Sequence, residues 1–443
     1  MAKKKQIELT IEEKLQNALV PKEEQPYKIP SNWCWTYIHN IAIVVTGKTP
    51  SKKNKEYYGG KFPFFKPADL DAGRNMQYAT EYLSEKGKSI SVIIPEKATG
   101  ICCIGTIGKC GYFLVEGTTN QQINTVISKI NPLYSYYFFN TNSFVRELIS
   151  KASATTIAIV NKSKLESCLF PVAPLNEQQR IVNRIESLFV KLDRAKELIE
   201  NTLAQFKQNK MAILHKAFTG ELTAKWRKEN NIDLSSWKKC ELKEVFKVVK
   251  DKYNPQTENQ IVNYIGLENI ETSKGIISKS NSSEVKSIKT KFKKDDVLYG
   301  KLRPYLNKHD VVNFDGICST DILVFRFNDI NTAKYINYYF NLPMFIQYAV
   351  ENSSGINLPR VSEKTISKYK ISLPTLEEQQ EIVNILDKLL AKYNKIKNLE
   401  QQLEKIELLK KAILAKAFRG ELGTNNPDEE SAENLLKEIL AEK

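Results

Sequence analysis

Two stretches of the chain carry apolar residues at alternating steps of four and three positions, the spacing of a helix with a heptad seam. In the first stretch the seam consists of Ile181, Ile185, Leu188, Leu192, Ala195 and Ile199. In the second stretch the same steps join Ile382, Leu386, Leu389, Tyr393 and Ile396, and the seam then drifts through Leu399, Leu403 and Ile406. Both stretches are predicted to be long helices whose seam residues are buried.

Helix-breaking residues mark the ends of both stretches. Pro174 and Pro374 lie just upstream of the predicted starts, and Gly220 and Gly420 lie where a helix stop is expected. A continuous helix over Glu177–Phe218 would be about 63 Å long. A helix of that length needs a partner to bury its seam. The two helices are therefore predicted to pack antiparallel, since a domain-sized segment connects them.

The two helical stretches are copies of each other. Glu177-Gln-Gln-Arg-Ile-Val-Asn183 returns as Glu378-Gln-Gln-Glu-Ile-Val-Asn384, and Ala212-Ile-Leu-His-Lys-Ala-Phe-Thr-Gly-Glu-Leu222 returns as Ala412-Ile-Leu-Ala-Lys-Ala-Phe-Arg-Gly-Glu-Leu422. The offset is 201 residues at the first signature and 200 at the second. One residue turns a helix by about 100°, so a local irregularity is expected. The repeat predicts a pseudo-twofold frame.

The segments joined by this frame mix short apolar runs with Gly, Pro and Asn, which is typical of α+β domains. Their ends look related. Trp33 and Trp237 open the two segments, and Val160 and Val361 lie equally far before the Gln-Gln signature. Gly105-Thr-Ile-Gly-Lys109 falls near the place of Gly300-Lys-Leu-Arg-Pro304, whereas the middles of the segments differ. One frame thus carries two unlike domains.

The predicted fold class is α+β, with two globular α+β domains separated by two long antiparallel coiled-coil helices. The expected segments are an N-terminal helical extension (1–27), a first domain (28–175), a first helical spacer (176–231), a second domain (232–375), and a second helical spacer with an acidic tail (376–443). The tail is expected to end in a short helix over Ala432–Leu440.

The positive charge of the chain lies in the two domains. The net charge is +15, and Lys and Arg exceed Asp and Glu by 8 over residues 28–175 and by 6 over residues 232–375. A basic excess of this kind favours a polyanionic partner such as nucleic acid, because Lys and Arg that neutralise phosphates release counterions. The alternative is that lysine is abundant for solubility alone.

Composition also limits the compartment and the redox chemistry. No stretch approaches the ~20 apolar residues of a transmembrane helix. Charged residues follow Met1-Ala-Lys-Lys-Lys5 where a signal peptide has an apolar core, so a cytoplasmic protein is expected. The seven cysteines form no CxxC pair, which predicts reduced structural thiols rather than disulfides or a zinc site.

No pattern typical of a catalytic site occurs in the sequence. The three histidines, His39, His215 and His309, lie in unrelated contexts. Gly105-Thr-Ile-Gly-Lys-Cys110 lacks the spacing of a phosphate loop and has Cys where a magnesium-binding hydroxyl is required. Asn131-Pro-Leu-Tyr134 lacks the second proline of the adenine methyltransferase motif, and no glycine-rich loop for a methyl-donor cofactor precedes it. The chain is predicted to recognise a ligand and to catalyse no reaction.

The repeated signatures resemble those of the specificity (S) subunit of type I restriction-modification enzymes. The domains carry further matches, namely Trp33-Cys-Trp35, Thr46-Gly-Lys-Thr-Pro50, Tyr57-Tyr-Gly-Gly60, Asn120-Gln-Gln122, Asp296-Val-Leu-Tyr-Gly-Lys-Leu-Arg-Pro-Tyr305 and Cys318-Ser-Thr-Asp321. The resemblance covers nearly the whole chain. Residues 1–27 and the acidic tail fall outside its clearest signatures.

This resemblance implies a function that the spacing of residues alone does not give. Such subunits have two target recognition domains, each recognising one half of a split double-stranded DNA site. They bind two methyltransferase (M) subunits and, in the complete enzyme, two restriction (R) subunits. S-adenosylmethionine, ATP and Mg are then expected in the partner subunits and no cofactor in this chain. Independently, pseudo-twofold symmetry suits two half-sites at a fixed separation.

Basic and amide side chains near glycine-rich loops are the candidates for DNA contact. Most are expected to contact phosphates, whereas the amides could pair with adenine edges and Arg303 with guanine. The candidates are Lys48, Lys52, Lys53, Lys55, Lys66, Arg74, Asn120, Gln121 and Gln122 in the first domain, and Lys301, Arg303, Lys308 and Arg360 in the second. For each of them the alternative is a solvated surface residue or an amide that structures a loop.

Side chains that are repeated on the frame without being required by the heptad pattern are the candidates for docking the M subunits. They are Gln178, Gln179, Lys216, Phe218, Gln379, Gln380, Lys416 and Phe418. The alternative is that these residues cap and pack the helix ends.

Two other classes of protein remain open at this point. One is an enzyme, a fused modification and cleavage protein, whose motifs this chain lacks. The other is a coiled-coil scaffold that does not bind DNA, which the basic domains oppose.

Overall fold

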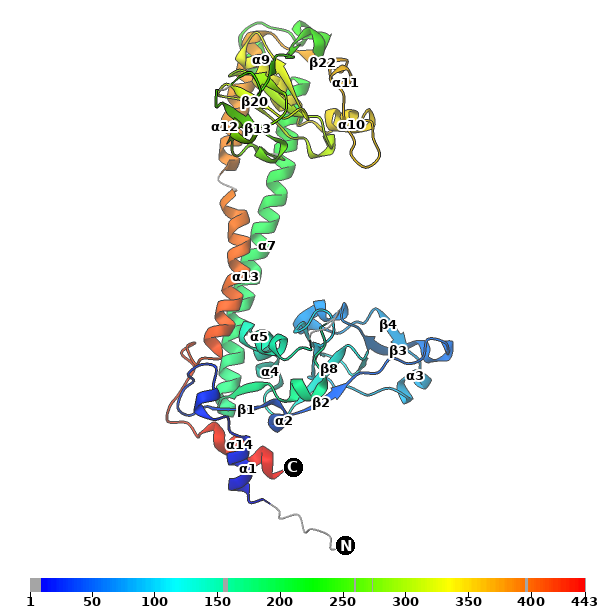
Figure 1. Ribbon diagram of the computed structural model, residues 1–443, viewed down its shortest axis with the longest axis vertical. Coiled ribbons are helices and arrows are strands. Elements are labelled where there is room, and N and C mark those ends of the chain that lie inside the picture. Colours follow the sequence, from blue (N-terminus) through cyan, green and yellow to red (C-terminus); the bar gives the residue numbers. More distant parts are fainter. Residues whose placement is uncertain (1–8, 154–157, 259, 273, 395–396, 443) are drawn as a thin grey trace. The chain divides into compact units, whose positions relative to one another are not determined.

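A computed structural model describes residues 9–153, 158–258, 260–272, 274–394 and 397–442 (Figure 1), and it describes the backbone alone for residues 390, 392–394 and 397. The chain divides into two compact units. Unit 1 comprises Met1–Leu198 and Gln401–Lys443, and unit 2 comprises Ile199–Glu400. Each unit therefore contains one predicted domain and parts of both helical stretches.

Unit 1 is built from short strands and helices between the two termini and the frame. Its strands are β1 (Cys34–Tyr37), β2 (Ala42–Thr46), β3 (Tyr58–Phe65), β4 (Glu81–Leu83), β5 (Thr99–Cys102), β6 (Cys110–Tyr112), β7 (Thr118–Thr119), β8 (Ile123–Ser128) and β9 (Leu169–Val172). Its α-helices before the frame are α1 (Ile11–Ala18), α2 (Ile38–Ile41), α3 (Glu85–Ser89), α4 (Pro132–Phe139), α5 (Asn142–Ser150) and α6 (Lys162–Glu166). Its 3₁₀ turns are η1 (Lys22–Glu24), η2 (Lys55–Tyr57) and η3 (Asp69–Asn75).

Three sheets order these strands. An antiparallel sheet has the order β2-β8-β5-β6, a second sheet has the order β4-β3-β7, and β1 pairs with β9. The β1–β9 pair joins the beginning of the domain to its end, since Cys34 lies opposite Val172. Within this unit β3, β4 and α3 extend away from the frame helices (Figure 1).

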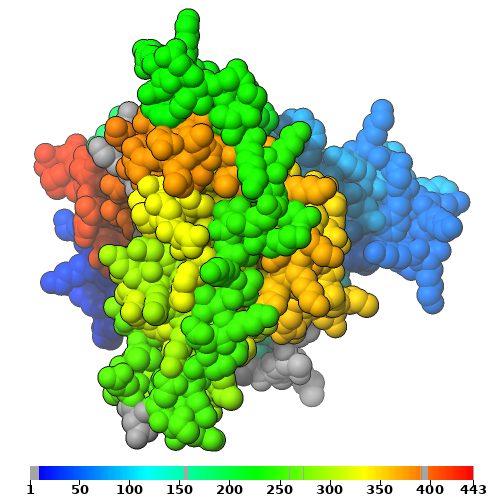
Figure 2. Space-filling model, turned by 90° about the horizontal axis from the view of Figure 1, so that it is seen from above, coloured from blue at the N-terminus to red at the C-terminus, as the bar shows by residue number. Residues whose placement is uncertain are grey.

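Unit 2 repeats part of this plan with shorter strands. Its strands are β10 (Lys238–Glu241), β11 (Lys247–Val248), β12 (Lys252–Tyr253), β13 (Asn263–Ile265), β14 (Ile270–Glu271), β15 (Gly275–Ile276), β16 (Ser280–Asn281), β17 (Lys289–Phe292), β18 (Val297–Gly300), β19 (His309–Val311), β20 (Gly316–Cys318), β21 (Ile322–Arg326) and β22 (Lys370–Leu373). Its α-helices outside the frame are α8 (Ala224–Glu229), α9 (Ile330–Tyr339), α10 (Pro343–Glu351) and α11 (Glu363–Ser367). Its 3₁₀ turns are η4 (Leu234–Ser236), η5 (Leu242–Glu244), η6 (Leu267–Asn269), η7 (Ser282–Glu284) and η8 (Pro304–Leu306). The segment around α8, green at the top of Figure 2, projects from the surface of this unit.

The two domains share two sheets and part of a third. The sheet β11-β21-β18-β19 of unit 2 has the strand order and antiparallel pairing of β2-β8-β5-β6, and β10 pairs with β22 as β1 pairs with β9. Within the five-stranded sheet β12-β17-β20-β13-β16 of unit 2, β13 pairs antiparallel with β16 and parallel with β20, as β3 of unit 1 pairs with β4 and β7, whereas β12 and β17 have no counterpart in the sheet β4-β3-β7. The prediction of related ends is confirmed, whereas the prediction of unlike middles holds only for added strands such as β12, β17 and the β14–β15 pair.

The frame helices follow the heptad prediction. Helix α7 (Leu175–Thr219) is continuous over 45 residues, and Gly220 follows it with a positive φ of 84°. The second stretch is described as α12 (Leu376–Asn394) and α13 (Lys397–Ala417), with Gly420 at a φ of 74° beyond it. The seam residue Ile396 and the side chain of Tyr393 lie outside the described residues.

The seam positions are withdrawn from solvent. Ile181, Ile185, Ile382, Leu386 and Ile406 are buried, and the remaining described seam residues are half-buried. Removing each fully buried side chain from water contributes about 1.5–3 kcal/mol to folding.

Helices α7 and α13 run antiparallel within unit 1. The carboxylate of Asp193 lies 2.5 Å from Nζ of Lys410, and Nζ of Lys196 lies 3.1 Å from the carboxylate of Glu407. The residue number rises along one helix as it falls along the other, so the helices point in opposite directions. In unit 2, Leu214 and Ala217 of α7 share a buried apolar cluster with Ile382 and Leu386 of α12.

The acidic tail is packed onto unit 1. Arg180 donates two hydrogen bonds of 2.7 and 2.8 Å to the carboxylate of Glu429, and its guanidinium holds the pKa of Glu429 below the usual value. Beyond it, α14 (Ala432–Ala441) buries Leu436 in the cluster that contains Leu15 of α1. The short helix predicted for the tail is present, and it contributes to the core of unit 1.

Candidate nucleic-acid interface and docking surface

In unit 1 the loop after β2 is fixed on the turn between β7 and β8. The backbone N–H of Gly47 donates to the carbonyl of Ile123 (3.1 Å), and that of Lys48 donates to the carbonyl of Thr119 (2.9 Å). A β-carbon at Gly47 would lie 2.2 Å from Oγ1 of Thr119, so this close approach requires glycine. We call residues 47–55 the lysine loop.

The lysine loop carries four cations that face solvent. Lys48, Lys52, Lys53 and Lys55 are exposed, and none of them forms an ion pair in the described part of the chain. Asn54 accepts a hydrogen bond from the backbone of Glu56 (3.1 Å), and Tyr58 donates to the carbonyl of Pro50 (2.6 Å). The backbone of the loop is therefore held in place while its ammonium groups stay available for an anion.

Of the predicted amides, Gln121 lies open beside the lysine loop, and Asn120 is buried. Nδ2 of Asn120 donates to Oε1 of Gln122 (3.0 Å), and its Oδ1 accepts from the backbone N–H of Gln122 (3.1 Å). Asn120 thus structures the turn, and the prediction that it contacts a base is corrected because its amide is buried and bonded within the turn. Gln121 is exposed and accepts a hydrogen bond from Oγ1 of Thr49 (2.5 Å).

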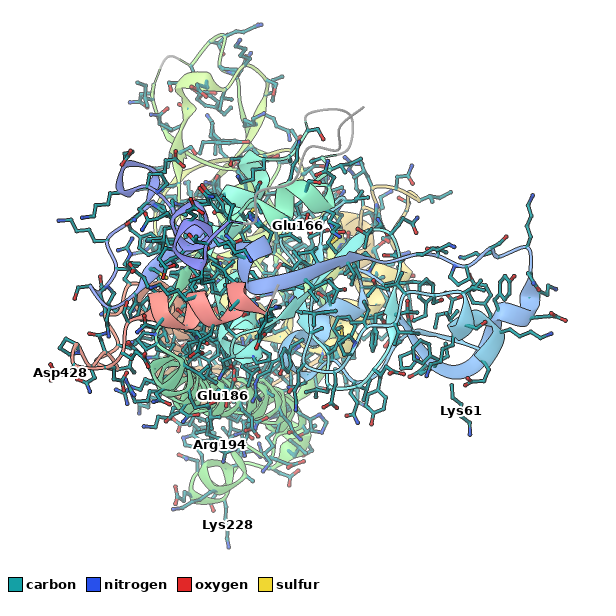
Figure 3. The ribbon with its side chains drawn as sticks, turned by 90° about the horizontal axis from the view of Figure 1, so that it is seen from below. Lys61, Glu166, Glu186, Arg194, Lys228 and Asp428 are labelled. Carbon is teal, nitrogen blue, oxygen red and sulfur yellow. The ribbon has the colours of Figure 1, made fainter. Side chains whose placement is uncertain are left out.

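The other two predicted cations of unit 1 have acidic partners. Nζ of Lys66 lies 2.5 Å from the carboxylate of Glu81, and Arg74 forms an ion pair with Glu186 of α7. Figure 3 shows Glu186 on the frame helix, whereas Lys61 of β3 lies on the part of the domain that extends away from it. Arg74 ties the domain to its helix and is less available for DNA than the lysine loop.

In unit 2 two of the predicted cations, Lys301 and Arg360, pair with Asp321. Nζ of Lys301 lies 4.0 Å and Nε of Arg360 lies 3.3 Å from the carboxylate of Asp321. Arg303 is exposed on the same turn, and no ion pair is formed by it among the residues that the structure describes. Lys308 instead donates to the carbonyl of Leu267 (2.7 Å) and holds the neighbouring loop.

A buried histidine supports this turn. Burial lowers the pKa of His309 to about 4, so the ring is neutral near pH 7. Its Nδ1 lies 2.7 Å from Oδ1 of Asn337, and its Nε2 lies 3.0 Å from Nδ2 of Asn307. A neutral ring can donate to Asn337 and accept from Asn307, which fixes the end of the turn.

Each frame helix begins with a buried glutamate that the sequence analysis did not assign. In unit 1, Glu177 accepts hydrogen bonds from the indole of Trp33 (2.8 Å) and from the amide of Asn425 (2.9 Å). In unit 2, Glu378 accepts from the indole of Trp237 (2.8 Å), from Thr223 (2.6 Å) and from Arg227. The sequence could have indicated this hydrogen bond, because both the glutamate and the tryptophan are repeated in the two copies.

Three of the predicted docking residues are buried. Gln178 donates to the carbonyl of Ala173 (2.8 Å), Gln379 donates to that of Pro374 (2.8 Å), and the ring of Phe418 lies 5.0 Å from that of Tyr134. A buried side chain offers no surface to a partner, so the docking prediction is corrected for these three residues. Phe218 is half-buried and packs on Tyr335 and Tyr339 of its own unit.

The exposed docking candidates lie on a face that recurs at the start of both frame helices. Leu175 and Leu376 each have an exposed fraction of 54%. One turn later Gln179 donates to Asn183 (2.9 Å), and Gln380 donates to Asn384 (3.2 Å). We call Leu175–Gln179–Asn183 and Leu376–Gln380–Asn384 the two docking stripes. Lys216 and Lys416 are also exposed, near the helix ends.

The two motifs that resemble catalytic elements are structural. Residues 105–109 connect β5 to the strand β6, whereas a phosphate loop leads into a helix, and Nζ of Lys109 lies 2.6 Å from the carboxylate of Asp71. Asn131 is the N-cap of α4 and accepts from the backbone N–H groups of Leu133 and Tyr134 (3.0 and 3.1 Å).

The cysteines behave as apolar core residues. All seven are free and buried. Burial raises the pKa of Cys34 and of Cys318 to about 12 and that of Cys103 to about 11, so these thiols stay protonated near pH 7. Among the described residues no cluster of His, Cys, Asp and Glu is arranged to hold a metal ion. The described helices include none that is long and apolar enough to cross a membrane.

These features define a class of protein: a duplicated recognition protein with two unlike α+β domains on like helical frames. The sequence model of the type I restriction modification DNA specificity domain matches residues 30–205 and 235–408. The chain therefore belongs to the family of type I restriction-modification specificity subunits.

Relatives over nearly the full length carry the same description. The chain is 25% identical to the type I restriction enzyme EcoDI specificity subunit of Escherichia coli, over 94% of this chain and 96% of the relative. It is 26% identical to the EcoKI specificity subunit of Escherichia coli (strain K12) over the same shares. It is 25% identical to the MjaIX specificity subunit of Methanocaldococcus jannaschii, over 90% of this chain and 96% of the relative.

Two solved structures share the fold. One is a chain from a study of complex assembly and conformational transition of the type I R-M system, with a TM-score of 0.66, 18% identity, and coverage of 89% of this chain and 100% of that chain. The other is the HsdS subunit from Thermoanaerobacter tengcongensis, with a TM-score of 0.55, 19% identity, and coverage of 90% and 99%.

Proposed function

We propose that each domain of this specificity subunit recognises one half of a split double-stranded DNA site, and that the frame helices set the separation of the half-sites and dock the M subunits. The observation that carries this proposal is one frame built twice around two unlike domains. The same antiparallel sheet occurs in each domain, and the same glutamate–tryptophan hydrogen bond joins each domain to its helix. Two similar helical frames can bind two copies of the same partner, and two different domains can recognise two different DNA half-sites.

The DNA-contacting surface is proposed to include the exposed cations on both domains. In unit 1 the lysine loop supplies four of them beside Gln121. In unit 2 the exposed Arg303 and Arg360 lie on or next to the turn 301–307, together with the half-buried Lys301. Phosphate contacts position a protein on the duplex, while a few side chains contact base edges. Gln121 has an exposed amide that could pair with an adenine edge. Gln122, Lys66, Arg74 and Lys308 are engaged within the fold and rank behind these residues.

The test of this function is the DNA motif that the complete enzyme methylates. Expressing the chain with its M subunit in a host that lacks adenine methylation, and mapping modified adenines by long-read sequencing, is expected to give two short half-sites of different sequence. A spacer of unspecified bases should separate them. A single continuous palindrome would contradict the assignment of one half-site to each domain.

The docking stripes are proposed to bind two copies of the M subunit, one on each stripe. An exposed leucine, a glutamine and an asparagine at steps of four residues share one helix face, and the stripe recurs in both copies with the same internal hydrogen bond. Two equal surfaces on one chain fit two copies of one partner. R subunits are proposed to join this assembly, and a cytoplasmic location stays a prediction.

Replacing Leu175 and Leu376 together by Glu is expected to weaken M-subunit binding at least ten-fold, because a charge would replace the apolar end of each stripe. Glutamate is favoured in the first turn of a helix, so the helices should stay folded. Native mass spectrometry should find two M subunits on the unmodified chain, one on each single variant and none on the double variant.

The control is Val190→Glu, which places a charge on an apolar residue of α7 that is 68% exposed and lies outside the stripe. This variant should keep both M subunits. Retention of two M subunits by the double variant would remove the stripes from the docking surface.

A further inference from the structure

The turn that carries Arg303 has a structural equivalent in unit 1. The N–H of Lys301 donates to the carbonyl of Asp321 (2.9 Å), as that of Cys103 donates to Gln122 (2.8 Å). Leu302 bridges to Arg360 as Ile104 bridges to Ile159. These matched hydrogen bonds place Arg303 of the turn 301–307 at the position that Gly105 holds in the turn 103–108.

Both turns need a left-handed backbone at this position. Gly105 has a φ of 82°, and Arg303 has a φ of 52° and a ψ of 65°. Glycine adopts this conformation freely, whereas the β-carbon of an L-residue crowds the following carbonyl. Pro304 adds to the restriction, because proline pushes its predecessor toward extended conformations. Unit 2 therefore has the bulky Arg303 at a left-handed position where unit 1 has Gly105, which adopts this conformation without strain.

At the other end of the turn, the left-handed position is held by Gly108 in unit 1 and by Asn307 in unit 2. Gly108 has a φ of 87° in unit 1, and Asn307 has a φ of 43° in unit 2. Asparagine tolerates this region, and the side chain of Asn307 is buried and bonded to His309 (3.0 Å). Asn307 is thus explained by the fold. Arg303 makes no comparable side-chain contact among the described residues, and its backbone is held by a 2.7 Å hydrogen bond from its N–H to the carbonyl of Pro359.

The surroundings of Arg303 favour an anion. Lys301 and Arg360 share the carboxylate of Asp321, so Lys301 and Arg303 of the turn and the neighbouring Arg360 together exceed the charge of this carboxylate by two. Arg303 is the exposed member that the carboxylate does not engage. A guanidinium can bind two phosphate oxygens at once, which suits the DNA backbone.

We propose that Arg303 is a phosphate-contacting residue of unit 2, and that the turn 301–307 keeps its strained backbone conformation in order to present this guanidinium to duplex DNA. This inference rests on the proposed DNA-binding function and deepens it by naming the contact and its chemistry.

The experiment compares Arg303→Gly with Arg303→Gln and Arg303→Lys in the full chain bound to its M subunits. Gly removes the charge and the strain, Gln removes the charge and keeps a β-carbon, and Lys keeps the charge. Gly and Gln are expected to weaken binding to specific and to random duplexes alike, about four-fold at 0.2 M salt. The slope of log K against log salt should become shallower by about 0.9, the value of one lost phosphate contact.

Thermal unfolding supplies the second readout. Arg303→Gly should raise the melting temperature by about 2 °C because the backbone is relaxed, and Arg303→Gln should leave it unchanged. Arg303→Lys should retain the original salt slope. If the Gly variant fails to fold, the Gln variant decides the result through its salt slope.

Three outcomes would overturn the inference. They are an unchanged salt slope in the Gln variant and in a folded Gly variant, a loss of discrimination at one base pair with the slope intact, and a Gly variant that folds but melts below the Gln variant. The second outcome would assign Arg303 to a base. A complex of the unmodified chain that binds neither duplex would instead refute the proposed function itself.

Discussion

Replacing Glu378 with Ala is expected to destabilise unit 2 by about 3–5 kcal/mol, because Arg227 would stay buried without its counter-charge. The variant also removes the acceptor of the Trp237 indole and of the Thr223 hydroxyl. For a unit of this size the melting temperature should fall on the order of 10 °C. Differential scanning calorimetry of the full chain would measure the shift.

The matched control is Glu177→Ala at the same position of the repeat. Its partners are the neutral groups of Trp33, Asn425 and Thr424, so no buried charge is stranded and the loss should be about 1–3 kcal/mol. Adding Arg227→Met to Glu378→Ala should restore part of the stability. Equal losses for the two glutamate variants would show that the Arg227 ion pair contributes nothing.

The function of this bond follows from the elements that it joins. The indole comes from the first residues of the domain, and the glutamate lies in the first turn of the frame helix of the same unit. The domain and its helix are therefore fixed at one point by a directional hydrogen bond. A recognition domain held rigidly on its helix loses little conformational entropy when it binds DNA.

The helical frame could be predicted because its signals are local and repeated. The steps of four and three defined the seam of α7, and Gly220 and Gly420 were found at positive φ where stops were expected. The relation between the two domains was predicted from Val160 and Val361. Their N–H groups donate to Cys103 (2.9 Å) and to Lys301 (3.0 Å) in equivalent places.

The parts that could not be predicted depend on contacts distant in sequence. Repetition of Gln178 and Gln379 indicated importance but not whether the side chains face a partner or the core. Arg180 is the one position of its signature that differs from the second copy, where Glu381 stands. It binds Glu429 of the tail, a partner about 250 residues away that periodicity does not reveal.

The charge of a side chain likewise did not reveal which DNA-contact candidates are exposed and which are paired with acidic residues. Lys66 and Arg74 looked equivalent to the lysine loop in sequence, yet Glu81 and Glu186 pair with them. Lys48, Lys52, Lys53 and Lys55 are exposed, and backbone hydrogen bonds hold their loop on the β7–β8 turn. Their contribution can be tested as a group.

Replacing Lys48, Lys52, Lys53 and Lys55 together by Ala is expected to lower affinity for every duplex about 300-fold at 0.2 M salt. Each phosphate contact contributes a slope of about 0.9 in log K against log salt, and hence about a four-fold factor at this concentration. The slope should become shallower by about 3.6 units in a fluorescence-anisotropy titration of the complex with its M subunits. Lys52→Ala with Lys53→Ala should give half of this change in slope.

The control removes the same net charge from the frame helices through Lys191→Ala, Lys207→Ala, Lys405→Ala and Lys411→Ala, four exposed lysines of α7 and α13. If the lysine loop contacts phosphates directly, this control should change the slope far less, because distant charges are screened over about 10 Å. Equal slopes for the two four-lysine variants would mean that the overall charge of the chain, and not the loop, attracts the DNA. We expect the smaller change of slope in the control, because Gly47 allows the lysine loop to lie close to the β7–β8 turn while its cations face solvent.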